Sequence, residues 1–511
     1  MFIELSITIL VLYIFWRWHI NSILDGLKSL KGPESYPFIG SLVICYPVSN
    51  LLARIGQMCD IYGQTYKMTI PWTAGIVTID LDLVEFILTS QATINKSILY
   101  IFLKEWLGDG LLLSKSAKWR LRRKTITPTF HFKVLDQFVH VFNKNNQILV
   151  QQLQKSIDKQ NGDGVVNIAH FVTLAAMDNI VETAMGTSMN SQLNDQSDYV
   201  WATKFMTANV YDHIVNPITY LKATYIFTPT YWKERKALKI LKNYTMSLIK
   251  TKRETLSNHN NTITENIHSD TDINLDDEHF GIKKKTAFLD LLLQTTIDGK
   301  PLSDEDIMEE VDTFMFEGHD TVSAAISFTL FCIAQHPDVQ SKIIEEQRSI
   351  FANEPDRDVT SEDLKDMHYL EMVIKEGLRL YPSVPGIARN VCEDFHYKDI
   401  HVRKGTTICI PIFKIHKDPA NFNDPEMFMP ERFLPTEQST RHAFAFLPFS
   451  AGHRNCIGQR FAMMEMKATI SKVCRHFELG MTNPPHKCIL PSAIVLMSTN
   501  GVNITMKRRK W

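Results

Sequence analysis

The chain begins with an apolar run that ends at the charged residue Arg17. Among the first 16 residues Glu4 is the only charged one, and Lys28 and Lys31 come after Arg17. Basic residues after an apolar segment favour the cytosolic side for the chain beyond it, whereas a cleaved signal peptide carries them before the segment. About 20 apolar residues are needed to cross a bilayer. The run is shorter, but it lacks the one-sided periodicity of a buried surface helix. We therefore expect residues 1–20 to be an uncleaved transmembrane anchor.

Proline and glycine then separate this segment from the rest of the chain. They predict a hinge over residues 21–40. Alternating apolar and polar positions at 66–70 and 74–79 predict two short strands. Helical patterns dominate from about Asp82 onward, and we expect residues 41–511 to form one body.

Three later stretches have the periodicity of helices. The longest covers 301–335, with Ser303 as a candidate N-cap and three acidic residues directly after it, which suits the positive end of a helix. A second stretch runs from 363 to 381 and stops at Pro382. A third covers 459–477.

The patterns of two other segments predict β structure, and that of a third predicts a loop. Residues 384–412 alternate as a small sheet does, and residues 494–505 predict a hairpin with its turn at 499–501. Residues 257–285 are polar and poor in aromatics, so we expect a flexible surface loop. The pattern as a whole predicts a mainly α fold with a small β region.

The composition excludes several classes of protein. The chain has 511 residues, of which 44% are hydrophobic, and a formal net charge of −1. A large core is therefore available, and no positive field points to nucleic acid. Eight scattered cysteines without C-x-x-C pairs argue against a disulfide framework. Basic residues gather near Arg120 and Arg122, where we expect a solvated helix face.

One cysteine differs from the others in its surroundings. Cys456 lies in Phe-Ser-Ala-Gly-His-Arg-Asn-Cys-Ile-Gly, with Phe449, Gly452, Arg454 and Gly458 around it. Glycines let the backbone approach a flat cofactor, and an arginine can bind a carboxylate at its rim. A chance match to these five positions has odds on the order of 10⁻⁴. Most single cysteines are inert core residues. This loop, however, resembles the haem-binding loop of the cytochrome P450 superfamily, whose cysteine thiolate ligates the iron.

A second motif lies inside the longest predicted helix. Gly318 weakens a helix by about 1 kcal/mol relative to Ala, and Thr321 can bond to a carbonyl one turn earlier and bend it. The plainer interpretation is a kinked core helix whose acids reach solvent. Beside the Cys456 loop, the motif resembles the superfamily's oxygen-activation motif, which implies that Asp320 and Thr321 deliver protons to dioxygen. The superfamily usually has a second Thr or Ser next, where this chain has Val322.

Glu317 narrows the resemblance. Most of the superfamily has alanine there, while residues 310–321 resemble family 4, which includes many insect members and microsomal enzymes. In that family this glutamate can form an ester with a methyl group of the haem. An ester would remove a charge that is unfavourable beside an apolar macrocycle. The resemblance thus implies haem b as cofactor, with Glu317 as a point of covalent attachment.

Four residues are candidates for holding the haem propionates. Trp119 and Arg123 are four positions apart, so they share a helix face. They match the family's W-x-x-x-R motif, whose residues contact the propionates. Arg389 and Arg454 are further candidates. The plainer interpretation of Trp119 is an ordinary core residue.

A third motif resembles a structural element of the superfamily. Glu376 and Arg379 match its E-x-x-R pattern, and Arg432 matches the position that completes the network. Their implied role is to hold the core behind the cysteine loop, not to take part in catalysis.

These resemblances imply a monooxygenase that inserts one oxygen atom into a lipophilic substrate. The chain has no G-x-G-x-x-G nucleotide site, so electrons would come from NADPH–cytochrome P450 reductase, with cytochrome b5 as a second candidate donor. The anchor implies the endoplasmic reticulum membrane, with the body facing the cytosol. Mostly apolar residues at 100–102, 384–387 and 496–500 are expected to line the substrate site. The resemblance suggests a fatty acid oxidised at or near its end, or a related lipid, a terpenoid or a xenobiotic.

Two other classes stay open at this point. One is a haem-thiolate isomerase or dehydratase that needs no external electrons; Asp320 and Thr321 argue against it, because such relatives often lack the acid–alcohol pair. The other is a haem-binding protein without turnover, against which the intact motifs argue. NADPH consumption with added reductase separates all three.

Overall fold

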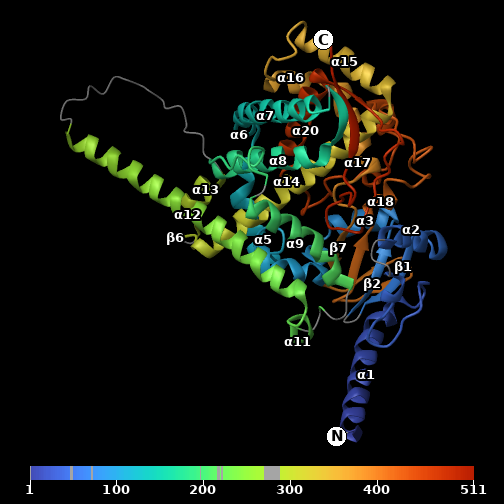
Figure 1. Ribbon diagram of the computed structural model, residues 1–511. Coiled ribbons are helices and arrows are strands. Elements are labelled where there is room, and N and C mark those ends of the chain that lie inside the picture. The colour runs from blue at the N-terminus through green and yellow to red at the C-terminus, as the bar shows by residue number, and fades with distance from the viewer. Residues whose placement is uncertain are drawn as a thin grey trace.

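Helices make up most of the structure, and the main sheet lies towards one side of it (Figure 1). The computed structural model describes residues 2–45, 50–70, 73–160, 162–195, 197–215, 219, 222–269, 288–297 and 299–511. The expected fold class, mainly α with a small β region, is confirmed.

A long helix, α14 (Asp304–Gln335), runs through the middle of the molecule (Figure 1). Ser303 caps it as predicted, because its hydroxyl accepts a hydrogen bond from the amide of Asp306 at 3.1 Å. Most of its residues are buried. It contacts α8 (Ile168–Ile180), α12 (Pro229–Ser269), α17 (His368–Leu380) and α20 (Gln459–His476). The helix is therefore the core element against which the others are placed.

Most of the other helices surround this core. The longer ones are α1 (Phe2–Leu24), α2 (Leu51–Tyr62), α3 (Leu81–Thr89), α5 (Ser116–Ile126), α7 (Val139–Asp158), α9 (Asp198–Val215) and α15 (Pro337–Phe351). The shorter ones are α4 (Lys104–Leu107), α6 (Phe132–Leu135), α11 (Lys222–Tyr225), α13 (Phe288–Gln294), α16 (Ser361–Asp366), α18 (Ile412–Ile415) and α19 (Pro435–Gln438).

The main sheet has five strands in the order β1-β2-β10-β7-β3. They are β1 (Thr65–Ile70), β2 (Thr73–Thr78), β10 (Thr407–Ile410), β7 (Ile387–Asn390) and β3 (Asn95–Lys96). Only the β2–β10 pair is parallel. A second sheet joins β11 (Phe477–Gly480), β12 (Asn503–Arg508) and β4 (Asp163–Asn167). Two-stranded pairs join β5 (Thr296–Ile297) to β6 (Lys300–Pro301) and β8 (Phe395–Tyr397) to β9 (Ile400–Val402).

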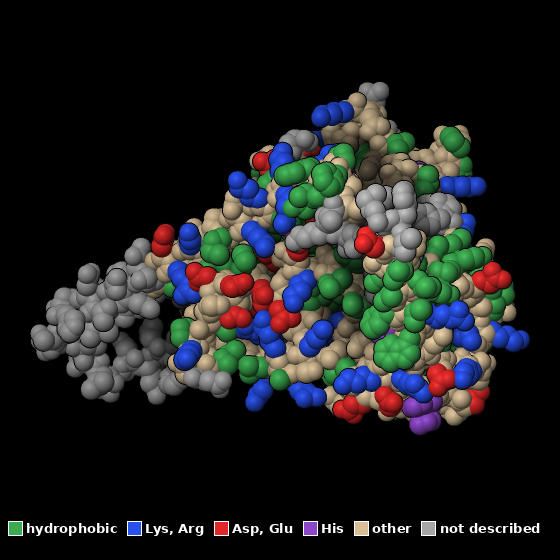
Figure 2. All heavy atoms as spheres, turned by 90° about the horizontal axis from the view of Figure 1, so that it is seen from below, with side chains coloured by type: hydrophobic (Ala, Val, Ile, Leu, Met, Phe, Trp, Pro, Cys, Tyr) green, Lys and Arg blue, Asp and Glu red, His purple; other side chains and the backbone are tan. Residues whose placement is uncertain are grey.

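Helix α1 projects from the body beside the main sheet (Figure 1). Residues Ser6–Leu27 are long and apolar enough to cross a membrane. The helix runs four residues past the predicted anchor boundary at residue 20, into the predicted hinge. Ile20 and Ile23 are buried against Ala74 of β2, so packing continues the helix beyond the apolar run. Figure 2 shows the molecule from below, and hydrophobic side chains gather on the face seen in that view.

Two predicted elements differ from the structure. The predicted helix at 363–381 is two helices, α16 and α17, which break at Met367. The predicted hairpin at 494–505 is wrong: β12 pairs with β11 and β4 instead. A turn does lie near 499–501, where the amide of Gly501 donates to the carbonyl of Ser498. The sequence pattern located the turn but could not identify partners distant along the chain.

The loop predicted at 257–285 is helical at its start. Helix α12 continues to Ser269, which contradicts a loop over 257–269. A lack of apolar residues prevents core packing, but it does not prevent a polar helix from extending past the body, as α12 does in Figure 1. The rest of the predicted loop, 270–285, lies outside the described residues.

Candidate functional site

The loop around Cys456 has a fixed shape that its glycines permit. The amide of Cys456 donates to the carbonyl of Phe449 at 2.9 Å, and Gly458 is the N-cap of α20. Gly452 has φ +69°, and a Cβ atom there would lie 1.8 Å from the carbonyl oxygen of Leu88. Only glycine satisfies both conditions. The loop is therefore held against α3 with its cysteine at the start of α20.

The Cys456 side chain lines a cavity of about 380 Å³. Cys456 is exposed, so its sulfur is accessible from this cavity. Burial, and then the nearby Glu317, raise the pKa of the thiol to about 11 against the amide hydrogen bond from Gly458. A thiol in such a place stays protonated unless a metal ion takes the place of the proton. The position of Cys456 at the cavity wall, and not its pKa, therefore suits it to ligate a metal ion.

The rest of the cavity wall is mostly apolar. It is formed by residues of the Cys456 loop, α14, α8, α5 and the segment after α17. Of the predicted substrate-site residues, Tyr100 and residues 384–387 line it. Ile101 does not line the cavity and is 53% exposed, and the Phe102 ring stacks on that of His213. Residues 494–495 line the cavity in place of the predicted residues 496–500. Such a wall suits a flat macrocycle and a lipophilic substrate.

Four cationic side chains gather at one side of this cavity. Lys96, Arg123 and Arg454 line it, and Arg389 lies on β7 directly opposite Lys96 in the sheet register. Burial, followed by Arg389 and Arg454, holds the pKa of Lys96 well below its usual range. Burial likewise lowers the pKa of Arg454, to about 9. The positive charges of these side chains repel one another, so anionic groups are expected to bind among them.

Two of these arginines have nitrogen atoms without a protein partner. Within the described part of the chain, Nη1 of Arg389 and Nε of Arg454 are buried and have no hydrogen-bond acceptor. Arg454 also donates to the carbonyl oxygens of Leu112 and Ser114, and its guanidinium lies 4.7 Å from the ring centroid of Trp119. Free donors beside an apolar cavity fit a cofactor with two carboxylates, as haem has. The residues present therefore fit the group that the sequence implied.

Arg123 connects the cation cluster to the cysteine loop. Its guanidinium donates to the backbone carbonyl and to the side-chain oxygen of Asn455, both at 2.8 Å. Asn455 directly precedes Cys456. Trp119 and Arg123 both line the cavity, as expected from their shared helix face.

Helix α14 forms the cavity wall through Glu317, Gly318 and Thr321. Thr321 donates to the carbonyl of Glu317 at 2.7 Å, one turn earlier, as predicted. A Cβ atom on Gly318 would lie 2.5 Å from the side chain of Ile180, so glycine allows α8 to approach here. Burial raises the pKa of Glu317, and Lys96, Arg123 and Arg454 oppose the shift.

Asp320 is not among the cavity-lining residues. One carboxylate oxygen lies 2.8 Å from the hydroxyl of Thr207 on α9, and the other lies 3.0 Å from Nε2 of His319. The structure thus brings Cys456, Glu317 and Thr321 to one cavity and turns Asp320 away from it.

The E-x-x-R pair is fully buried and supports the cysteine loop. Arg379 and Glu376 form two hydrogen bonds of 2.7 and 2.8 Å, and Arg432 lies 3.4 Å from Glu376. Arg379 also donates to the carbonyl of His416, whose Nε2 accepts from the amide of Leu447. Burial lowers the pKa of His416 to about 3, so its ring is neutral and can accept. Leu447 begins the segment that leads to Cys456.

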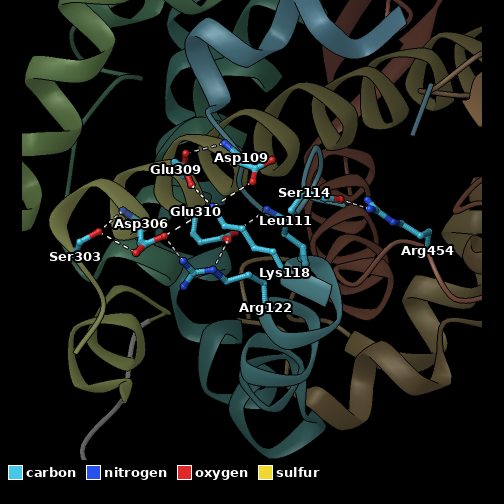
Figure 3. A network of polar contacts seen from close by, with 10 residues as sticks. All are labelled: Asp109, Leu111, Ser114, Lys118, Arg122, Ser303, Asp306, Glu309, Glu310 and Arg454. Carbon is cyan, nitrogen blue, oxygen red and sulfur yellow. Dashed lines mark hydrogen bonds and ion pairs between the residues drawn. The ribbon is translucent and has the colours of Figure 1, made fainter. Parts of the chain in front are cut away.

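Arg122 is buried, contrary to the expected solvated face. It is 4% exposed and pairs with Asp306 and, at 3.5 Å, with Glu310 of α14 (Figure 3). On a helix it lies three residues after Trp119, on the same side, and acids from another element offset its charge. Arg120 is exposed, as expected. The charges near Arg122 in the sequence could not show that acids of α14 would pair with it.

Acids of α14 also fix the segment 109–114, which holds Arg454 (Figure 3). Glu309 accepts from the amide of Asp109 at 2.8 Å, and Glu310 accepts from the amide of Leu111 at 2.9 Å. Burial raises the pKa of Glu310 to about 7 against the Leu111 amide and Arg122. Carbonyl groups of this segment then accept from Arg454. Helix α14 therefore shapes both the cavity wall and the cation cluster.

Lys96, Thr207 and His319 were not predicted from the sequence. A charged residue between Ile94 and Ile98 was the available signal for a buried lysine, but nothing local showed that β3 would join β7. Thr207 contacts Asp320 from α9, and no local pattern in the sequence could show this contact.

Comparisons with known proteins agree with this geometry. A family model described as Cytochrome P450 matches residues 30–506. Cytochrome P450 4d2 of Drosophila melanogaster is 41% identical over 508 residues, 98% of this chain and 97% of its own length. Human cytochrome P450 4V2 is 40% identical over 93% of this chain and 89% of its own length. Cytochrome P450 4c21 of Blattella germanica is 39% identical over 94% of each.

Proposed function

The chain belongs to the cytochrome P450 superfamily, resembles its family 4 and is a haem-thiolate monooxygenase; from this premise we propose that it hydroxylates a fatty acid or related lipid at or near the end of the chain. One observation carries the proposal. Cys456, Glu317 and Thr321, far apart in sequence, line a single apolar cavity. Terpenoids and xenobiotics are the alternative lipophilic substrates.

Each site residue has a proposed part in holding the haem. Cys456 ligates the iron, and Phe449 supports it through the carbonyl that accepts the Cys456 amide. Arg454, Arg389 and Arg123 hold the propionates, with Trp119 packed beneath Arg454. Haem bound through a thiolate supplies dioxygen activation and insertion of one oxygen atom into a C–H bond.

Asp320 and Thr321 are the proposed proton-delivery pair. Thr321 keeps its hydroxyl at the cavity wall by donating to the Glu317 carbonyl. Asp320 is directly adjacent but engages Thr207 and His319. Delivery therefore requires the carboxyl to turn about its Cα–Cβ bond towards Thr321.

Glu317 is proposed to attach the haem covalently and to favour terminal oxidation. Its carboxyl lies in the cavity with a raised pKa, which arises from burial. Formation of an ester would remove the charge and hold the macrocycle in one position. Internal C–H bonds of an alkyl chain are weaker than terminal ones, so selectivity for the end must come from orientation.

The proposed partners are based on the absence of a nucleotide motif and on α1. Electrons come from NADPH–cytochrome P450 reductase, with cytochrome b5 as a second donor. The endoplasmic reticulum membrane is the proposed location, with residues 41–511 on the cytosolic side. The apolar span Ser6–Leu27 supports this proposal.

A spectrum and a turnover assay test the function together. The reduced, CO-bound protein should have the far red-shifted Soret band of thiolate ligation, and Cys456→Ala should lose it. Cys474→Ala, at a buried cysteine of α20 outside the cavity, is the matched control. With added reductase, NADPH should be consumed and a long-chain fatty acid hydroxylated. A Cys456→Ala protein that keeps the band contradicts the ligand assignment, and an intact band without NADPH consumption contradicts the monooxygenase assay.

A further inference from the structure

His319 and Asp320 form a buried polar pair on α14, outside the cavity wall. Their exposed fractions are 2% and 9%. Nδ1 of His319 lies 2.6 Å from the carbonyl oxygen of Met315, one turn earlier. Nε2 of the same ring lies 3.0 Å from Oδ1 of Asp320. Both ring nitrogens therefore face oxygen atoms.

Proton counting shows that this pair shares a proton. A carbonyl oxygen only accepts, so Nδ1 of His319 must carry a hydrogen atom. A neutral ring would then leave Nε2 as an acceptor facing an ionised carboxylate, two acceptors at 3.0 Å. A buried contact of this kind is unfavourable. One more proton therefore lies between Nε2 and Oδ1.

The second oxygen of Asp320 is held on the side of α9. The Thr207 hydroxyl lies 2.8 Å from Oδ2 and 2.9 Å from the carbonyl of Thr203. A hydroxyl has a single proton to offer to these two acceptors. Thr207 can thus fix the direction of the carboxyl but cannot supply a proton on every turnover without regaining one.

The charges around His319 favour the protonated ring. Burial alone would lower its pKa, but the Asp320 carboxylate and the Met315 carbonyl raise it above the usual value. Lys204 on α9 acts in the opposite direction. On α8, the Asp178 carboxylate is taken up by the amides of Ser191 and Gln192.

Resting on the proposed monooxygenase function, we propose that His319 is a positioning residue that acts through Asp320 by holding the proton that Asp320 passes on. The N–H bond at Nε2 breaks as an O–H bond forms at Oδ1, and Asp320 then passes this proton towards Thr321. The ring becomes neutral and keeps its Nδ1 hydrogen on the Met315 carbonyl. It regains a proton from bulk water before the next turnover, so the protons balance.

The first test compares His319→Gln with His336→Gln. His336 makes the same bond from Nδ1 to a carbonyl one turn earlier, that of Cys332 at 2.8 Å, and ends the same helix. We expect His319→Gln to keep the CO-bound Soret band and the substrate-induced shift. Its product yield per NADPH should fall roughly ten-fold, below the usual range for direct acid–base groups because it acts through Asp320. His336→Gln should match the wild type.

The pH profile separates proton supply from a structural role. In the wild type, coupling of NADPH to product should fall as pH rises through the folded pKa of His319, which lies above the usual 6.5. His319→Gln should lose that step. A profile of unchanged shape and lower amplitude, or unchanged coupling, overturns the proposal. His319→Asn, with a smaller side chain, repeats the test if glutamine is not accommodated.

A measurement without turnover distinguishes this proposal from the monooxygenase assignment. In protein labelled with nitrogen-15 histidine, the His319 ring should be doubly protonated at pH 6, with the His319→Gln spectrum identifying its signal. A neutral ring there overturns the proposal whatever the enzyme activity. A doubly protonated ring in a protein that consumes no NADPH would instead contradict the proposed function.

Discussion

At the scale of single residues, Thr321 offers the cleanest separation of chemistry from binding. Its hydroxyl is tied to the Glu317 carbonyl while its side chain lines the cavity. Thr321→Ala should keep the substrate-induced spectral shift and divert reduced oxygen to peroxide. We expect product per NADPH to fall by roughly 10²-fold, the lower end for acid–base assistance. Peroxide and product measured in one assay check this.

Thr329 provides the matched control for that substitution. It is also on α14, donates to a carbonyl one turn earlier at 2.7 Å and does not line the cavity. Thr329→Ala should leave the ratio of product to NADPH unchanged. Equal coupling in the two alanine variants would remove Thr321 from proton delivery.

Glu317 can be tested by extraction of the haem. After turnover, acid–acetone should leave much of the haem on the wild-type protein, because an ester survives the loss of axial ligation. Glu317→Ala should release all of it. Glu305→Ala controls for loss of an exposed carboxylate on α14 outside the cavity. Full release from the wild type would contradict the ester and leave terminal selectivity to the shape of the cavity.

The residues that could be predicted are those whose motif is local. The loop around Cys456 required only its own glycines and arginine, and Trp119 and Arg123 required only helical spacing. Arg122 and Lys96 could not be placed, because the acids that pair with Arg122 and the strand that adjoins Lys96 are distant in sequence. The direction of Asp320 likewise depends on Thr207 of α9.

At the scale of elements, the contact of α14 with the segment 109–114 makes a separate prediction. Glu310→Ala removes one of the carboxylates that offset the charge of the buried Arg122 guanidinium. Losing one partner of a buried ion pair typically lowers the free energy of unfolding by about 3–5 kcal/mol. We expect a lower denaturation midpoint and, in protein that has not turned over, faster haem loss to apomyoglobin. Glu310→Gln should be milder, because its amide oxygen can accept from Leu111. Equal haem loss from both variants would show that the segment does not depend on this bond.

Helix boundaries were predictable where the periodic pattern of apolar residues agreed with a residue that starts or stops a helix. The N-cap at Ser303 and the stop at Pro382 gave good boundaries for α14 and for the end of α17. The break at Met367 and the continuation of α12 to Ser269 had no such signal. The failed hairpin shows the same limit, because β12 takes its partners from β4 and β11 through long-range pairing.

At the scale of the whole molecule, α1 should decide where the protein resides. Several of its apolar side chains, such as Leu10 and Phe15, are more than half exposed. Removing residues 1–19 keeps Ile20, Ile23 and the bond from Arg403 to Ser22. The shortened protein should keep its CO-bound spectrum and bind microsomal vesicles far more weakly in sedimentation. Unchanged sedimentation would assign the membrane contact to the body.

The buried acids of the core predict how stability depends on pH. Glu465 on α20 is fully buried, and the hydrogen bond from Asn179 only partly offsets the burial that raises its pKa to about 8. Between the ordinary value near 4.5 and about 8, the folded state therefore binds more protons than the unfolded state. Stability must fall as pH rises through this window, by up to several kcal/mol.

Glu465→Gln tests this dependence because it removes the titration and keeps an oxygen that accepts from Asn179. At pH 8.5 the variant should have a higher urea midpoint than the wild type, and at pH 5 the two should be nearly equal. Asp312 and Glu310, with pKa values raised to about 7 by burial, leave the variant a smaller slope of the same sign. Glu182→Gln, at a partly exposed acid paired with Lys144, should leave the slope unchanged. Parallel pH dependence in the wild type and Glu465→Gln would mean that Glu465 is already ionised in the folded protein, with its charge stabilised by groups beyond Asn179.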